Sequence, residues 1–591
     1  MQITELTSVF LRNFSRKHRY FYAAIAFTLV GMPLYVEAGL YRKNILAQER
    51  PETEVPRSKE LIRAVATPRI TTPVSGVYLV EGLILVEGGR ELHTIHREHG
   101  IHIDLGKGDY SLLHKQLEPY LNYPLNIESI QQIKATIVDY FLKEKNQYVA
   151  AIVPVQEVSD QVLVLEILEG AVGEITYRGQ KWFSPWALQR GLEVKKGDPI
   201  IEKQLLDYLT WVNRNPFHHL QLILQPGRTK GTTDIEFMSQ ERFPVRFFSG
   251  ADNTGFIANG GQTRLYAGFN WGNALQIGDL LSYQYTSSVN FHGFQSHVVN
   301  YSSFLSWKHL FTIFGCYGQV YPTIPDFTTV GKNLQGSIRY DIPIKPLYGD
   351  FRTNAMVGFD FKYQNSNLFF AGNAAEVSAV IQTINVTQFL FSYSFQKNWT
   401  NQAINCETQL VTSLWKDWWI PYQTSFDYNA LRENSHVRYA YLKFSLTDSY
   451  SFPGDWIIAT QFRMQIASQT LPSSEEFALG GANTVRGYYE QQFLADNAFC
   501  FNIEAYSPPL SLFNAVRNEL TFLLFFDYGY GRGYSAVSPP YISQNLVGIG
   551  PGMRYDIVPY LSLKADYGFQ VLGIPLDHRF GRFHLSITAS Y

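Results

Sequence analysis

The chain ends on Gly581-Arg582-Phe583-His584-Leu585-Ser586-Ile587-Thr588-Ala589-Ser590-Tyr591, a stretch that alternates between apolar and polar residues. A period of two places successive side chains on opposite faces of a strand, so one face is apolar and the other polar. Residues 561–569 alternate in the same way. A strand of about ten residues with a large apolar face is typical of a transmembrane β-barrel. The chain is therefore expected to cross a membrane with strands.

Composition agrees with such a barrel and excludes other classes of protein. Among 591 residues, 15% are aromatic and 17% are charged, as aromatic girdles and a lipid-facing surface require. Composition alone leaves a soluble all-β protein open. The net charge of −2 gives no electrostatic case for a nucleic-acid partner. Cys316, Cys406 and Cys500 are too few and too far apart for a disulfide framework or a zinc site, and are expected to be small apolar fillers in strands.

The N-terminus has the pattern of an export signal over residues 1–38. Four basic residues between Arg12 and Arg19 precede an apolar run over residues 20–36, and Val36-Glu37-Ala38 fits a cleavage site. The alternative is a membrane anchor helix, which Pro33 and the short run disfavour. Residues 39–76 are expected to hold a short polar helix and a proline-containing linker. Export followed by a barrel predicts the outer membrane of a diderm bacterium or a related organelle.

Two small α+β domains are predicted next, over residues 77–170 and 171–241. Each follows the order strand, helix, helix, strand, strand, so the pair is an internal repeat. The helix over residues 127–145 has apolar residues spaced by three and four. Residues 87–110 fit this order poorly.

Residues 242–591 show alternating segments to the end of the chain. This alternation predicts a mainly β fold whose largest part is a transmembrane barrel of about 16 strands. That is an even number, as single-chain bacterial barrels require. The strands are expected near residues 245, 264, 280, 296, 310, 333, 353, 388, 405, 437, 457, 498, 520, 545, 561 and 582.

Several motifs occur in a characteristic order. They are Val153-Pro154-Val155-Gln156-Glu157-Val158-Ser159-Asp160, Trp211-Val212-Asn213-Arg214-Asn215-Pro216-Phe217, Asp252-Asn253-Thr254-Gly255, Asn273-Ala274-Leu275-Gln276-Ile277-Gly278-Asp279, Val485-Arg486-Gly487-Tyr488 and Phe526-Asp527-Tyr528-Gly529. Together they resemble the outer-membrane transporters of two-partner secretion, the TpsB family of haemolysin and haemagglutinin activation and secretion proteins.

The resemblance implies an architecture and a partner. It implies a signal peptide, a plug helix within residues 39–76, two periplasmic POTRA domains (77–170 and 171–241) and a 16-strand barrel. It also implies a secreted TpsA-like polypeptide as partner, contact with outer-membrane lipid, and recognition of the C-terminal residue by the barrel-assembly machinery. The family usually ends in Phe, and here the last residue is Tyr591.

The loop motif carries a physical expectation of its own. Residues 467–496 are long enough to fold back into the lumen, and the resemblance implies that they do. Leu520, Phe522, Leu524 and Phe526 would face lipid, which turns Asp527 toward the lumen. There Arg486 can reach it and form a bidentate pair. The alternative is that Arg486 is an ordinary surface-loop charge.

The small domains suggest capture of an unfolded chain, because an exposed sheet edge can accept an added strand. The candidate residues for this contact are Asn213, Arg214, Asn215, Pro216 and Phe217. The alternative is that these domains are rigid spacers.

No enzyme, cofactor or metal centre is predicted. His93, His96, His99 and His102 recur every third residue, but a solvated strand or loop explains them better than a metal site. His218-His219 is expected to be ordinary domain surface. Neither a Gly-x-Ser-x-Gly elbow nor a phosphate-binding loop occurs, so no lipase chemistry and no nucleotide is expected.

The expected function is a passive pore that recognises an unfolded partner and translocates it from the periplasm to the cell surface. One alternative is an assembly factor for outer-membrane barrels, which would need lateral opening between the strands near Val245 and Phe583. A second alternative is a solute porin or receptor, which has no use for two periplasmic repeats.

Overall fold

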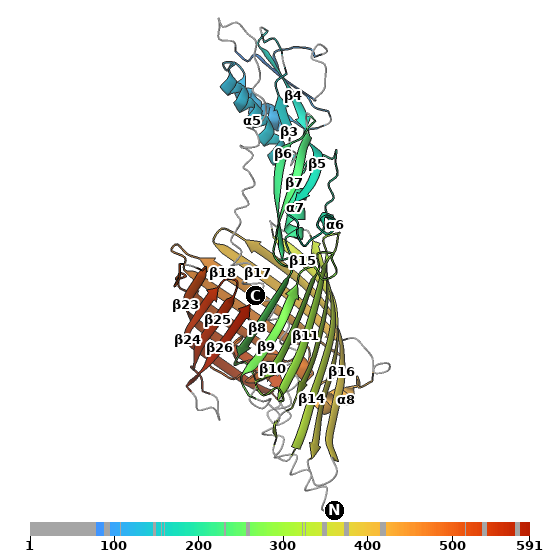
Figure 1. Cartoon of the computed structure of the whole chain (residues 1–591), viewed down its shortest axis with the longest axis vertical. Coiled ribbons are helices and arrows are strands. Elements are labelled where there is room, and N and C mark those ends of the chain that lie inside the picture. The colour runs from blue at the N-terminus through green and yellow to red at the C-terminus, as the bar shows by residue number, and fades with distance from the viewer. Residues whose placement is uncertain are drawn as a thin grey trace, which may run out of the picture. The chain divides into compact units, whose positions relative to one another are not determined.

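The computed structural model describes residues 79–87, 95–106, 108–145, 149–154, 156–158, 160–229, 232–255, 261–321, 323–324, 327–344, 351–370, 377–413, 421–514, 516–534, 541–573 and 580–591. The chain divides into two compact units, one within Leu46–Arg242 and one containing Phe243–Tyr591 (Figure 1). The predicted signal peptide, plug helix and linker lie outside the described residues.

The first α+β domain packs two helices on one four-stranded sheet of order β2-β1-β4-β3. Helix α5 begins after Asn126, which caps it. The Asn126 side chain accepts a 2.8 Å bond from the Ser129 amide, and the Ser129 hydroxyl accepts a 3.0 Å bond from the Asn126 amide. Ile133 and Ile137 of α5 are fully buried against the sheet. The elements are β1 (Gly82–Glu87), β2 (Gly100–Asp104), α4 (Ser111–Leu117), η3 (Glu118–Tyr120), α5 (Ile127–Glu144), β3 (Val149–Ile152) and β4 (Val162–Glu169).

Strand β2 explains why residues 87–110 fit the repeat poorly. It is an additional edge strand that runs parallel to β1, from the pair Gly82 and Gly100 to the pair Val86 and Asp104. The second domain has no counterpart among its described residues. Its sheet has the order β5-β7-β6. Its elements are β5 (Ala171–Arg178), α6 (Pro185–Gln189), α7 (Glu202–Val212), β6 (His218–Pro226) and β7 (Thr232–Glu241).

Phe243–Tyr591 contains a closed antiparallel barrel of 16 long strands, which confirms the predicted fold class. Each predicted position falls in or beside one of them. The strands are β8 (Val245–Asp252), β9 (Arg264–Trp271), β10 (Leu280–Ser288), β11 (Phe294–Phe304), β12 (Leu310–Val320), β14 (Phe327–Ile344), β15 (Arg352–Phe370), β16 (Val377–Asn398), β17 (Gln402–Ser413), β18 (Tyr439–Ser451), β19 (Ile457–Ala467), β22 (Asn497–Tyr506), β23 (Asn518–Tyr534), β24 (Tyr541–Ile557), β25 (Leu561–Gln570) and β26 (Gly581–Ser590). The two-residue strand β13 (Thr323–Ile324) pairs with β14.

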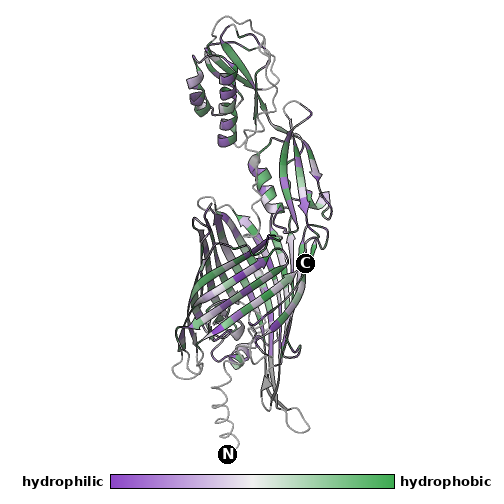
Figure 2. Cartoon of the chain, turned by 60° about the vertical axis from the view of Figure 1, so that its left-hand side comes forward, coloured by the Kyte–Doolittle hydropathy of each residue, from purple (hydrophilic) through white to green (hydrophobic). Residues whose placement is uncertain are grey.

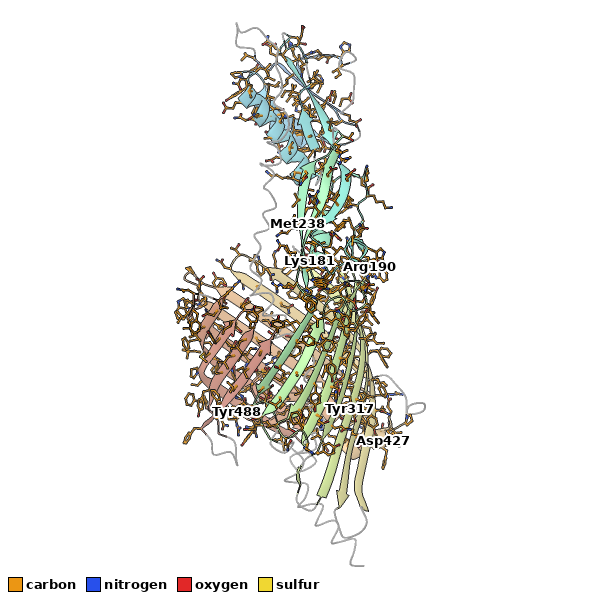
Figure 3. The ribbon with its side chains drawn as sticks, viewed as in Figure 1. Lys181, Arg190, Met238, Tyr317, Asp427 and Tyr488 are labelled. Carbon is orange, nitrogen blue, oxygen red and sulfur yellow. The ribbon has the colours of Figure 1, made fainter. Side chains whose placement is uncertain are left out.

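The alternation that predicted these strands also decides which side chains face outward. Figure 2 shows hydrophobic and hydrophilic residues alternating along the barrel strands. In β26, Phe583 is 50% exposed on the outer face while His584 is 7% exposed on the inner face. Tyr317 of β12 likewise lies on the outer face (Figure 3). No helix among the described residues has the length and apolarity needed to span a membrane.

The barrel closes where the last strand meets the first. Strand β26 pairs with β8 over five positions, from Ser586 with Asp252 to Ser590 with Phe248, whereas β8 and β9 pair over eight. Beyond the ladder, Tyr591 and Phe247 exchange backbone hydrogen bonds of 2.9 and 3.0 Å. This closing seam is the shortest ladder between neighbouring long strands in the described barrel.

Two segments between strands fold against the inner wall. One holds the short helix α8 (Ser425–Leu431), begun by Thr424, which shares a capping box with Asp427 (Figure 3). Tyr428 of α8 is fully buried and donates a 2.8 Å bond to the Asn385 carbonyl of β16. The other segment is the long connection from β19 to β22.

Candidate functional site

The connection between β19 and β22, residues 468–496, is called here the lumen loop. It contains the turn η5 (Ser473–Glu475) and a small hairpin of β20 (Phe477–Leu479) and β21 (Phe493–Ala495). Leu479, Val485 and Tyr488 have no exposed surface and pack in one apolar cluster with the inner wall. Residues of the lumen loop therefore pack against the inner wall of the barrel.

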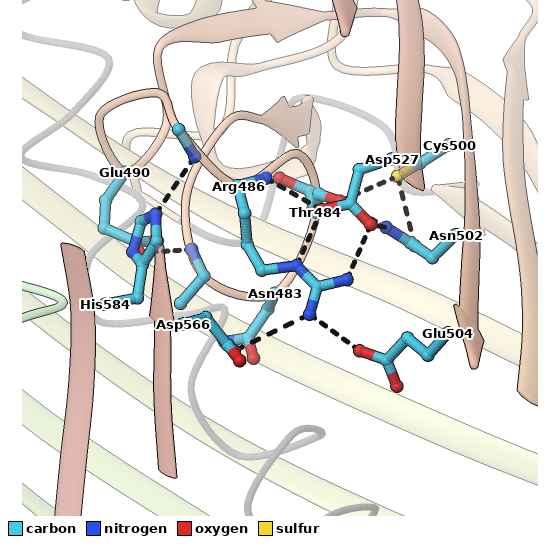
Figure 4. A network of polar contacts seen from close by, with 12 residues as sticks. Asn483, Thr484, Arg486, Glu490, Cys500, Asn502, Glu504, Asp527, Asp566 and His584 are labelled. Atoms are coloured by element: carbon cyan, nitrogen blue, oxygen red, sulfur yellow. Dashed lines mark hydrogen bonds and ion pairs between the residues drawn. The ribbon is translucent and has the colours of Figure 1, made fainter. Parts of the chain in front are cut away.

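The structure brings the two sequence-predicted residues Arg486 and Asp527 together (Figure 4). The Arg486 Nε and Nη2 atoms each lie 2.7 Å from a different Asp527 carboxylate oxygen, which is a bidentate pair. The Arg486 backbone amide donates a third bond of 3.0 Å to the same carboxylate. Asp527 is fully buried and Arg486 is 3% exposed. A surface-loop charge would have neither this partner nor this burial.

Further groups complete the surroundings of the Arg486 guanidinium. Its Nη1 atom lies 2.7 Å from Glu504 and 3.6 Å from Asp566 (Figure 4), and its central carbon lies 3.5 Å from the centre of the Phe525 ring. Asn502 donates a 2.7 Å bond to Asp527. One guanidinium thus meets three carboxylates and the face of one aromatic ring, so its charge is compensated although water is excluded.

The residues after Arg486 attach the loop to the wall through backbone groups. The Gly487 amide lies 3.2 Å from His584 Nε2, and its carbonyl accepts a 2.8 Å bond from Gln570. The Tyr488 hydroxyl donates a 2.7 Å bond to the Leu572 carbonyl, accepts one of 3.1 Å from the Val547 amide and lies 3.0 Å from the Val547 carbonyl. Gly487 has φ of +97°, a conformation that glycine adopts without steric cost. The loop tip is therefore attached to the wall by four consecutive motif residues, Val485, Arg486, Gly487 and Tyr488.

Wall glycines make room for this attachment, and only one of them was anticipated. A Cβ atom on Gly529 would come within 2.8 Å of the Val485 side chain, so the predicted motif Phe526-Asp527-Tyr528-Gly529 supplies both charge and space. A Cβ on Gly548 would overlap the Arg486 carbonyl oxygen, and one on Gly568 would overlap the Gly487 amide. Sequence reasoning missed these two. The alternation of their strands places both glycines on the inner face, and this was the sequence signal that could have identified them. Phe526 faces outward, as expected, at 42% exposure.

The root of the lumen loop is held by a second buried arginine. Arg432 makes a bidentate pair with Asp496 at 2.6 and 2.8 Å, and also lies 2.9 Å from Glu476. Arg432 follows α8, so this pair joins the two inward segments. Asp496 also accepts a 2.8 Å bond from the Leu471 amide, and thereby holds the two ends of the loop together.

The candidate capture residues lie at the turn between α7 and β6 in the second domain. Asn213 bonds the Leu220 backbone at 2.7 and 3.0 Å, and the Asn215 side chain accepts a 3.0 Å bond from the Phe217 amide. Asn215 and Phe217 are buried, and Pro216 is exposed. This geometry shapes a turn and leaves the capture role of Asn213, Arg214, Asn215, Pro216 and Phe217 a prediction.

The histidines are not grouped into a metal site. His99 lies 3.4 Å from Glu81 and His102 lies 3.8 Å from Glu98, both exposed pairs, and His93 lies outside the described residues. No cluster of three His, Cys, Asp or Glu side chains in the described part of the chain could hold a metal ion. The three cysteines are buried in β12, β17 and β22, and none of them forms a disulfide. His218 is buried rather than on the surface, which corrects that expectation.

Comparison with known proteins places this geometry in a family. Residues 231–555, more than half of the chain, match the family described as haemolysin secretion/activation protein ShlB/FhaC/HecB. The heme/hemopexin transporter protein HuxB of Haemophilus influenzae (strain 86-028NP) is 22% identical over 452 residues, which cover 74% of this chain and 77% of that protein.

Solved structures share the fold. The structure of CdiB from Escherichia coli aligns with a TM-score of 0.68 at 16% identity, covering 95% of this chain and 99% of that one. CdiB from Acinetobacter baumannii aligns with a TM-score of 0.61 at 16% identity, covering 96% and 99%. The chain belongs to the haemolysin secretion/activation family, the TpsB transporters of two-partner secretion, and is an outer-membrane pore that translocates a partner exoprotein to the cell surface.

Proposed function

We propose that the lumen loop sets the transport-competent state of this pore and that the Arg486–Asp527 pair holds the loop in place. The observation that carries the proposal is the buried bidentate pair, reinforced by the Arg486 amide. Removing one partner leaves the other charged and buried, which costs about 3–5 kcal/mol. The loop would then detach from β23.

We also propose that the two α+β domains are POTRA domains that receive the unfolded partner in the periplasm. A strand of the partner would add to an exposed sheet edge, where backbone groups supply affinity without demanding a sequence. In the second domain β5 is an edge strand. Single prolines placed along residues 173–178 of β5 would, at alternate positions, remove the backbone donors of that edge. The expected result is weaker partner binding.

The partner is proposed to be a TpsA-like polypeptide, and two further contacts are proposed for the barrel. Outward apolar side chains such as Phe522 and Leu524, at 48% and 67% exposure, would contact outer-membrane lipid. Tyr591, at 91% exposure, would be the residue that the barrel-assembly machinery recognises.

The experiment that tests the proposal compares export of a candidate partner in cells with the wild-type chain, with Asp527→Asn, or with Glu519→Gln as control. Glu519 is an exposed acidic residue of the same strand. We expect export to fall at least tenfold in Asp527→Asn, at equal amounts of folded barrel, and to be unchanged in the control. Undiminished export in Asp527→Asn would refute the role of the pair.

One observation favours the alternative that the protein is an assembly factor. The seam between β26 and β8 has the five-position ladder described above, and a short ladder is what lateral opening would use. A disulfide engineered across it, through cysteines at Ser249 and Ala589, which are paired in register, separates the two functions. A pore tolerates the crosslink, whereas an insertase loses activity.

A further inference from the structure

The lumen loop carries a second buried carboxylate that no sequence motif identified. Glu475, in η5, is 2% exposed, and its two oxygens lie 2.7 and 3.0 Å from Lys362 Nζ of β15. Tyr441 of β18 donates a 2.7 Å bond to it, and Gln388 of β16 lies at 3.3 Å. The carboxylate therefore bonds three strands of the wall.

These strands differ from those that hold Arg486. Counted around the barrel from β8, strands β15, β16 and β18 come before the root of the lumen loop at β19 and β22. The partners of Arg486 and Gly487 lie on β22, at the root itself, and on β23, β25 and β26, which come after it. The loop is thus fastened to the wall on both sides of its own origin.

The two attachments are also built differently. The Arg486 attachment uses backbone groups and a fitted row of glycines beside its ion pair. Glu475 is held on the wall by the side chains of Lys362, Tyr441 and Gln388. The links from Glu475 to β15, β16 and β18 therefore depend on one carboxylate, while its carbonyl accepts a 2.9 Å bond from Gln465 of β19 and the neighbouring Glu476 pairs with Arg432.

The wall that Glu475 covers is positively charged. Lys362 lies beside it, and Arg339 lies 2.6 Å from Asp360, the acidic wall residue that also accepts a 3.0 Å bond from Gln388. Lys443 lies 5.1 Å from the centre of the Tyr441 ring. Without Glu475, three cations remain beside the two carboxylates of Asp360 and Glu407.

We propose that Glu475 is a second, independent positioning residue of the pore, which holds the η5 segment of the lumen loop over a cationic wall and can release it while Arg486 stays bound. This rests on the proposed role of the loop. Release at Glu475 alone would widen the lumen beside β15–β18 and expose Lys362 to the passing chain, whereas the attachment at β22–β26 would remain.

The test uses the full-length protein in detergent and planar bilayers, with Glu475→Gln compared with Glu407→Gln. Glu407 is a lumen-facing carboxylate of β17 that accepts bonds from Ser392 and Gln409, both on barrel strands. Both variants remove one negative charge from the lumen. Only the first removes a loop attachment.

In Glu475→Gln we expect exchange of the residue 475 amide, which bonds the Pro472 carbonyl at 2.9 Å, to rise roughly tenfold or more, while exchange at Arg486 and Tyr488 stays at the wild-type rate. Conductance should rise in this variant and not in Glu407→Gln, although both should shift the reversal potential toward anion selectivity. Lys362→Met should release the same segment, η5. The double variant with Lys362→Met and Glu475→Gln should lose no more exchange protection than the more strongly affected single variant.

Three outcomes would overturn the proposal. Unchanged exchange of the residue 475 amide in a folded Glu475→Gln barrel would show that the carboxylate holds nothing. Simultaneous release at Tyr488 would show one cooperative attachment. Equal conductance in Glu475→Gln and Glu407→Gln would show a charge effect alone. Partner export is not part of this readout, so failure of the proposed function is observed separately.

Discussion

Gly568 of β25 lies directly against Gly487 of the lumen loop, so that a methyl group on either residue would meet the backbone of the other. A Cβ on Gly487 would come within 2.9 Å of the Gly568 carbonyl oxygen. Two glycines far apart in the sequence therefore define how closely the loop approaches the wall.

Gly568→Ala is expected to lift the tip of the lumen loop without removing any charge. Overpacking of this kind costs about 1–3 kcal/mol, because the obstructing atoms belong to the backbone and cannot rotate away. Faster hydrogen exchange at the Gly487 and Tyr488 amides would be the direct sign. Gly336→Ala is the control, since nothing lies within 4 Å of a Cβ there. Equal behaviour of the two variants would contradict the close fit.

Arg486→Lys tests whether geometry or charge holds the pair. Lysine keeps the charge but lacks the planar fork that meets both Asp527 oxygens, so we expect a loss of about 2–4 kcal/mol in loop attachment. The neighbouring carboxylates Glu504 and Asp566 leave the new ammonium with partners, which places the loss below that of a neutral substitution. Loop protection should fall in the order wild type, Arg486→Lys, Arg486→Gln. Identical protection in wild type and Arg486→Lys would assign the attachment to charge alone.

Strand positions were predictable because lipid imposes one rule along the whole barrel. Each outward residue must be apolar and each inward one can be polar, so alternation marks a strand whatever its neighbours. Arg486 and Asp527 were found because a recognised motif named them. Glu475 and Lys362 were not, because polar residues fill the inner face of every strand and sequence alone does not show which two meet across the lumen.

The additional strand β2 was missed for a different reason. It spans only Gly100–Asp104. It also runs parallel to β1, so no hairpin turn marks it in the sequence. Ile101 and Ile103 pack on the domain core, whereas His102 and Asp104 are exposed. Two apolar residues are too short a pattern to identify a strand.

His218 makes the second α+β domain sensitive to acid. Burial lowers the pKa of His218 from 6.5 to about 4, although the nearby Glu241 opposes this shift. The folded domain therefore keeps His218 neutral, while the unfolded chain takes up a proton below about pH 6.5. Stability is complete above that pH and falls as the pH drops toward 4. The difference corresponds to about 3 kcal/mol at most.

Hydrogen-exchange protection of Leu220–Leu224, corrected for intrinsic rates, should measure this loss between pH 7 and pH 4.5. His218→Phe should remove most of the pH dependence, because a phenyl ring can occupy the site beside Phe183, whose ring centre lies 4.5 Å away. A smaller slope should remain, since burial also lowers the pKa of the adjacent His219. His99→Gln changes an exposed histidine and is the control. An undiminished slope in His218→Phe would assign the acid sensitivity to other groups.

Two roles are proposed for Tyr591, one for its backbone in closing the barrel and one for its side chain in recognition by the assembly machinery. The backbone exchanges hydrogen bonds of 2.9 and 3.0 Å with Phe247, whereas the side chain is 91% exposed. Deleting Tyr591 removes both bonds from the short seam and should lower barrel stability by about 1–3 kcal/mol, seen as unfolding at a lower temperature on a gel that separates folded from unfolded barrel. Tyr591→Ala keeps both bonds, so the purified barrel should unfold like the wild type while its assembly in cells declines. Tyr591→Phe should assemble at least as well as the wild type. If Tyr591→Ala assembles normally, the machinery does not recognise this side chain, and the last residue serves only to close the seam.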